Sequence, residues 1–196
     1  PIEEIYSRLR RILGHNPNLA LHPDDPPVES LGGVARIMRS DVQFVVVSKS
    51  GADEPLSRVF LDFQARWPDR LQVNLEADTA ALHRALAAAD SLIVPRVEPG
   101  SAWHLRAQRY GALPLGPAEG AFGDAVVDCD AKLSTGTGFT FREATDETLL
   151  GTVQRAASAF VNRESFERVR NRVLRSDPSW ERAAYLYERL YAAASE

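Results

Sequence analysis

Two loops of the sequence combine residue types that could hold a phosphate group. Glu98-Pro99-Gly100-Ser101 leads directly into a predicted helix, and the free backbone N–H groups at the start of a helix favour an anion. The loop from Gly116 to Ala121, which contains Gly120, is built largely from small residues that let a ligand approach the backbone. Neither loop matches a standard glycine-rich phosphate fingerprint. The residues alone therefore favour two ordinary connections between a strand and a helix.

Glu98 is a candidate for sugar binding, because it follows the short apolar stretch that ends at Val97. Its carboxylate could accept hydrogen bonds from sugar hydroxyls. It could equally cap the next helix, whose dipole favours an anion at this end. The residue pattern leaves both interpretations open.

Three further side chains could carry chemistry, but their surroundings favour structural roles. Cys129 lies between Asp128 and Asp130, and nearby negative charge should raise the pKa of its thiol and disfavour a nucleophilic thiolate. His83 and His104 lie on different predicted helices without the spacing of metal ligands, so we expect them to be packed or exposed. We predict no metal site and no cofactor from these residues.

The composition is that of a soluble globular domain. The 196 residues are 44% apolar and 26% charged, enough for one domain with a buried core. A net charge of −4 gives no overall attraction for nucleic acid, and no apolar run approaches the roughly 20 residues that span a bilayer. One cysteine excludes an intrachain disulfide and fits a reducing cytoplasm. Since the chain starts at Pro1 without a signal-peptide pattern, we expect it to belong to a longer protein.

The order of apolar runs and turns predicts an α/β fold. Short strands are expected at 18–21, 43–48, 71–75, 91–95, 112–115 and 125–127, and helices at about 2–13, 28–38, 54–66, 78–89 and 101–109. Runs of continuous apolar residues are typical of parallel strands buried on both faces. We therefore predict a Rossmann-like, doubly wound parallel sheet with helices on both faces. After Phe141 the pattern is helical, with starts near Thr145 or Asp146, near Glu164 and at Asp177-Pro178-Ser179-Trp180.

Several short motifs, in the same order along the chain, resemble the bacterial glycogen synthase and plant starch synthase family. The family's segment "ADMFLMPSRFEPCGL" followed by "RYGTLPIV" is similar to the stretch from Ala89 to Pro99 and to Arg109-Tyr110-Gly111-Ala112-Leu113-Pro114. Similar stretches are Gly123 to Asp128, Thr137 to Phe141 and Asp177 to Ala184, with Tyr185 to Tyr191 in the final helix. The resemblance covers nearly all of the chain after about residue 40.

The resemblance implies a GT-B glycosyltransferase, in which the active site lies between two Rossmann-like domains. Such enzymes transfer glucose from ADP-glucose or UDP-glucose to an α-1,4-glucan, with retention and without a metal. Residues 1–196 would be the single C-terminal, donor-binding domain, and an N-terminal acceptor domain, absent from this chain, would be its partner. The implied location is the cytoplasm. Glu98 would contact the donor sugar, and backbone groups of Gly100, Ser101, Gly120 and Ala121 would hold the diphosphate.

The expected donor site has diverged from the family pattern. The loop from Leu21 to Pro27 carries Asp24 and Asp25 where the family has an Arg and a Lys that neutralise the diphosphate. Loss of such cations costs on the order of a hundredfold per contact in phosphate chemistry. Ala77 stands where the family stacks a Tyr on the base, and Glu119 places a negative charge in the second loop.

Three functions are compatible with the sequence. The first is a working or divergent glucosyltransferase that binds ADP-glucose or ADP, with α-glucan as acceptor. The second is a degenerate, non-catalytic domain that acts as a binding or interaction module, which we favour for the isolated chain because half of any GT-B site lies in the other domain. The third, another GT-B activity such as an epimerase or phosphorylase, is disfavoured by the Arg109-Tyr110-Gly111 spacing and the Ser179-Trp180-Glu181 helix.

Overall fold

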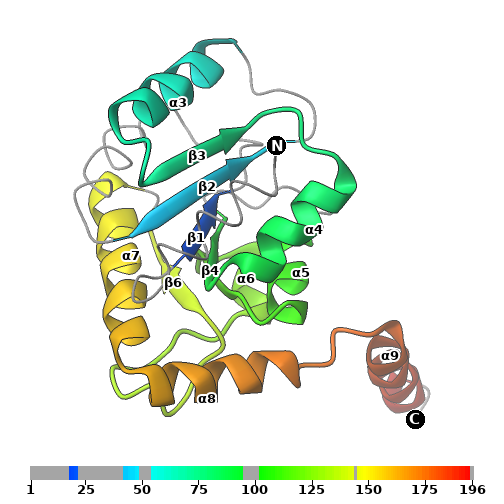
Figure 1. Ribbon diagram of the computed structural model, residues 1–196. Coiled ribbons are helices and arrows are strands. Elements are labelled where there is room, and N and C mark those ends of the chain that lie inside the picture. The colour runs from blue at the N-terminus through cyan, green and yellow to red at the C-terminus, as the bar shows by residue number, and fades with distance from the viewer. Residues whose placement is uncertain (1–17, 22–41, 49–53, 95–101, 144, 195–196) are drawn as a thin grey trace.

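The computed structural model describes residues 18–21, 42–48, 54–94, 102–143 and 145–194 (Figure 1). Six parallel strands form one sheet in the order β3-β2-β1-β4-β5-β6. The strands are β1 Asn18–Leu21, β2 Gln43–Val47, β3 Leu71–Asn74, β4 Ser91–Ile93, β5 Leu113–Pro117 and β6 Phe139–Phe141. This is the strand order of a doubly wound Rossmann-like sheet, which confirms the predicted fold class.

Helices cover both faces of the sheet. α3 Glu54–Arg66, α7 Asp146–Val161 and α8 Arg163–Leu174 lie over one face, and α4 Thr79–Ala88, α5 Trp103–Arg109 and α6 Gly120–Ala125 lie over the other (Figure 1). Phe44 and Val46 of β2 pack into the core cluster on the first face, whereas Val45 and Val47 contact a cluster on the second. Apolar residues on both sides of a strand explain why its sequence lacks alternation.

Helix starts follow the expected capping chemistry. The Asp78 side chain accepts a hydrogen bond from the N–H of Ala81 at 2.6 Å, which confirms its predicted place before α4. Thr145, rather than Asp146, caps α7 and forms a capping box with Thr148. Each cap satisfies N–H groups that have no partner inside the helix.

The predicted strand at 125–127 is wrong. Ala125 ends α6, Val126 caps that helix and is buried, and Val127 is exposed. The sixth strand is instead Phe139–Phe141, which pairs with β5, and only a bridge between Asp128 and Gly138 lies beside it. A short apolar run fits a buried helix end as well as a strand, so periodicity could not separate them. The predicted helices at 2–13 and 28–38 lie outside the described residues.

The last helix, α9 Trp180–Ala194, stands away from the body of the sheet (Figure 1). Its large apolar side chains are more than half exposed, including Trp180 at 81% and Tyr191 at 65%. The others are Tyr185, Leu186, Tyr187 and Leu190. A helix surface with this much exposed aromatic area is typical of a contact with another protein surface.

Candidate functional site

In doubly wound sheets a ligand binds beyond the carboxyl ends of the strands, where the strand order reverses. In this sheet the reversal lies between β1 and β4. The loops after these strands, 22–27 and 95–101, lie outside the described residues, so the roles of Glu98, Gly100 and Ser101 stay predictions. The described residues bring three other segments to this edge: the turn after β3, the start of α5 and the turn after β5.

The turn from β5 into α6 holds the other two predicted contacts, Gly120 and Ala121. Both are exposed, and Gly120 has a φ of +53°, in the left-handed region that glycine adopts at low cost. Glu119 precedes the helix with an extended backbone and makes no side-chain cap hydrogen bond. The turn therefore offers backbone to a ligand without a local cap, and its phosphate-binding role remains a prediction.

Phe122 supports this turn from below. Its ring is fully buried, and a Cβ atom on Gly116 would lie 2.6 Å from the ring. Because residue 116 is a glycine, the Phe122 ring can lie directly against β5. This close packing fixes the position of the loop that carries Gly120.

Exposed carboxylates line the described part of this edge. Glu76 and Asp78 lie in the turn after β3, and Glu119 lies after β5. Arg84 approaches Asp78 at 3.9 Å, but both side chains are about half exposed or more, so this ion pair is weak. The acidic rim agrees with the divergence seen in the sequence and should lower the affinity for an anionic ligand.

Ala77 and Trp103 lie together at this edge. Ala77 is buried, and its N–H donates to the carbonyl oxygen of Ser48 at 2.7 Å. Trp103, the first residue of α5, packs partly buried against the cluster that contains Ala77 and Val47. Trp103 is not among the site residues predicted from the sequence, although it is an aromatic residue just after a predicted phosphate-binding loop.

His83 and His104 have the structural roles expected from the sequence. His83 is exposed, and its Nδ1 lies 2.6 Å from the hydroxyl of Tyr110. His104 is buried with its ring against Phe122, and burial lowers its pKa below the ordinary value of 6.5. Among the described residues, no cluster of three or more His, Cys, Asp or Glu side chains could hold a metal ion.

The lowered pKa of His104 makes stability depend on pH. Below pH 6.5 the unfolded chain binds a proton at His104 that the folded chain resists, so the free energy of unfolding falls as the pH falls toward the folded pKa. We expect urea unfolding between pH 7.5 and 5.5 to show a smaller loss for His104→Gln than for the unchanged chain. Parallel pH profiles for the two chains would contradict this assignment.

Cys129 is a buried structural residue, as predicted. Burial raises the pKa of its thiol to about 11, and the nearby Asp128 adds to the rise. A thiol with this pKa is protonated at neutral pH, which argues against a nucleophile.

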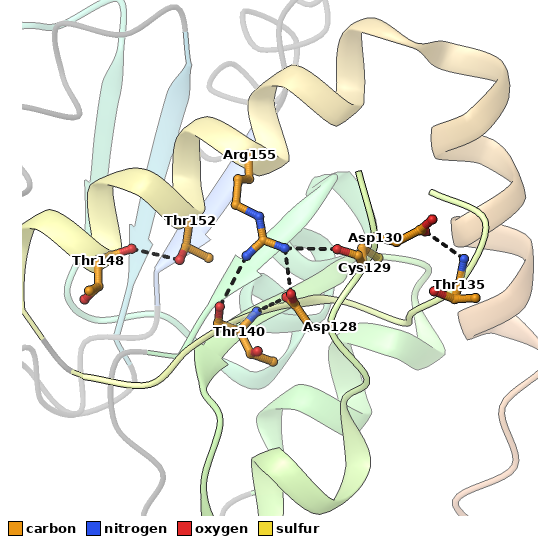
Figure 2. A network of polar contacts seen from close by, with 8 residues as sticks. All are labelled: Asp128, Cys129, Asp130, Thr135, Thr140, Thr148, Thr152 and Arg155. Atoms are coloured by element: carbon orange, nitrogen blue, oxygen red, sulfur yellow. Dashed lines mark hydrogen bonds and ion pairs between the residues drawn. The ribbon is translucent and has the colours of Figure 1, made fainter. Parts of the chain in front are cut away.

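A polar network fixes the segment on either side of Cys129 (Figure 2). Arg155 of α7 donates to a carboxylate oxygen of Asp128 at 2.7 Å and to the carbonyl oxygen of Cys129 at 3.0 Å. The other oxygen of Asp128 accepts from the N–H of Thr140 at 2.7 Å. These contacts hold the segment around 128 against the free edge of β6, which is a structural function.

The loop from 130 to 136 is held in the same manner. Asp130 accepts a hydrogen bond from the N–H of Thr135, which lowers the pKa of its carboxyl group. Arg172 of α8 donates to the carbonyl oxygens of Ser134 and Gly136 at 2.8 and 2.6 Å. A hollow of about 640 Å³ between this loop and α7 lies at the amino end of β6, away from the candidate site.

Comparison with known proteins identifies the relatives of the chain. It is 30% identical over 174 residues to a glycogen synthase of Thermosipho africanus, covering 87% of this chain and 36% of that protein. A glycogen synthase of Anaeromyxobacter sp. is 34% identical over 156 residues, covering 79% of this chain and 32% of that protein. The chain thus spans about a third of the length of these relatives. No protein-family model matches it.

Solved structures agree with the sequence relatives. The catalytic domain of starch synthase IV from Arabidopsis thaliana, bound to ADP and acarbose, superposes with a TM-score of 0.75 at 25% identity, covering 98% of this chain and 42% of that one. A sucrose-phosphate synthase from Thermosynechococcus elongatus, at 21% identity and a TM-score of 0.63, shares the fold.

The parallel sheet with helices on both faces matches one Rossmann-like domain of the GT-B glycosyltransferases. Within that class, the chain is similar to glycogen and starch synthases, to which 79–98% of it aligns at 25–34% identity. Among the described residues, no helix is long and apolar enough to cross a membrane.

Proposed function

We propose that the chain is the nucleotide-sugar-binding domain of a synthase that transfers glucose from ADP-glucose to an α-1,4-glucan. The observation that carries this proposal is the superposition of nearly the whole chain on a starch synthase catalytic domain bound to ADP. A doubly wound sheet presents strand ends and helix starts to a nucleotide, and the described turns after β3 and β5 occupy those positions.

In this proposal the chain's own groups bind and orient the donor. Glu98 would accept hydrogen bonds from the hydroxyls of the donor glucose. Backbone N–H groups of Gly100, Ser101, Gly120 and Ala121 would contact the diphosphate, the leaving group of the transfer. N–H groups aimed at the departing phosphates stabilise the charge that develops there, so the chemistry needs positioning and electrostatics from this half of the site.

The proposal includes a second domain and the glucan as partners. The aligned part of the chain covers only about a third of these relatives, and a GT-B site needs groups from both domains. The exposed aromatic side chains of α9, with Trp180 and Tyr191 among them, supply an apolar surface suited to packing against such a domain. The cytoplasmic location and the preference for ADP-glucose over UDP-glucose belong to this proposal as well.

The alternative is a non-catalytic domain of the same family that acts as a binding module. The observations that favour it are the carboxylates of Glu76, Asp78 and Glu119 at the described edge and the absence of Arg and Lys between Leu21 and Pro27. An acidic site weakens the binding of a diphosphate, and the two functions therefore differ in donor affinity.

Calorimetric titration of the chain with ADP, UDP and their glucose esters tests the proposal. We expect weak but saturable binding of ADP and ADP-glucose, since half of the site lies in this domain. Glucose transfer by the protein that carries both domains then separates a working enzyme from a binding module, because only the enzyme turns over.

A further inference from the structure

Trp103 supplies an aromatic surface at the carboxyl edge of the sheet. It is the first residue of α5 and is partly exposed, and its buried part packs against two core clusters. Two other aromatic residues near this edge, Phe122 and Phe141, are 0% and 6% exposed. Among the described residues of the edge, Trp103 is therefore the aromatic side chain that a ligand can reach.

One face of the Trp103 ring already carries a planar group. The guanidinium carbon of Arg106 lies 4.7 Å from the ring centroid. Arg106 is exposed, and a stacked guanidinium on a surface contributes little and moves easily. A flat aromatic group of similar thickness can take its place on the ring.

One of the two clusters against which Trp103 packs is rich in alanine. It contains Ala77, Ala81 and Ala85 of the segment around α4, together with Leu82. Val47, at the carboxyl end of β2, completes this wall. The indole is thus held in place on one side by apolar contacts, which makes it a rigid platform.

We propose that Trp103 stacks on the nucleobase of the donor and that Arg106 moves off the ring when the base binds. This inference rests on the proposed function, because it requires the chain to bind a nucleotide. Stacking uses the π-face that every base has, so the contact supplies affinity for the base while other groups select the sugar.

The test compares ADP with inorganic pyrophosphate, which lacks the base, in titrations of the full 196-residue chain. Loss of one stacked base corresponds to about a 10-fold weaker affinity. Trp103→Leu, which keeps apolar volume, should weaken ADP by about this factor and leave pyrophosphate unchanged, and Trp103→Phe should lose less. Trp180→Phe on α9 is the matched control and should change neither ligand.

Fluorescence gives a second readout. In a chain with Trp67→Phe and Trp180→Phe, Trp103 is the one remaining tryptophan, and ADP should quench it with the affinity found by calorimetry. Unchanged or tighter ADP binding by Trp103→Leu, with the unchanged chain still binding ADP, would overturn the stacking and leave the proposed function standing. No binding of ADP or pyrophosphate by the unchanged chain would overturn both.

Discussion

Replacing Gly136 by alanine is expected to lower the free energy of unfolding by about 3 kcal/mol or more. Gly136 has a φ of +94°, outside the region that side chains tolerate. An added Cβ atom would also lie within 2.6 Å of the backbone nitrogen of Cys129, and backbone cannot swing aside as a side chain can. The carbonyl of Gly136 accepts a hydrogen bond from Arg172, so a shift of this residue also loosens α8.

Gly120→Ala is the matched control for this prediction. Gly120 also has a positive φ, but no atom lies within 4 Å of the added Cβ, so its cost should stay near 1 kcal/mol. Urea unfolding of both variants measures the difference. Equal losses of unfolding free energy in the two variants would show that the clash between the added Cβ atom and the backbone of Cys129 does not contribute to the destabilisation.

Truncating Phe122 to alanine is expected to cost about 3–5 kcal/mol of stability and to weaken ADP binding. The ring is fully buried between Gly116, His104 and the second-face core, and its loss leaves a cavity under the turn that carries Gly120 and Ala121. A turn without support beneath it holds its backbone groups less precisely, which lowers affinity for a ligand.

Phe160→Ala separates the two effects. Phe160 is equally buried but lies near the end of α7, where it packs against Phe166. Both variants should lose similar stability in urea unfolding, but only Phe122→Ala should bind ADP more weakly at a temperature where both are folded. The same affinity in both variants would contradict the supporting role of Phe122.

The predictable parts of the fold are those with strong local signals. The Asp78 cap, the helix from Glu54 to Arg66 and the buried β2 strand were each set by caps, turns and apolar runs, and each has the predicted type. The strand predicted at 125–127 is wrong because a run of three apolar residues is too short to show the repeat of a strand or of a helix. Their place at the end of α6 depends on tertiary packing. The side chain of Val126 lies so close to Gly138 that a Cβ atom added to this glycine would be 2.6 Å from it.

The sequence predicted which loops form the candidate site but not which side chains meet there. The succession of strands and helices and the motif spacing predicted which loops carry the candidate residues, and Glu119 already indicated in the sequence that the second loop had diverged. The contact of Trp103 with the cluster around Ala77 joins residues from separate βα units, and only the folded sheet brings them together. That is why the sequence showed an alanine without an aromatic partner, while in the structure an aromatic ring packs against the cluster that contains this alanine.

Binding of a nucleotide sugar by this domain can be measured by titrating ADP-glucose and ADP into the full chain in a calorimeter. UDP and UDP-glucose serve as the comparison for base preference. We expect one saturable site for ADP-glucose, competition between ADP-glucose and ADP, and weaker heats with the uridine compounds. An absence of heat with all four ligands at millimolar concentration would contradict this expectation.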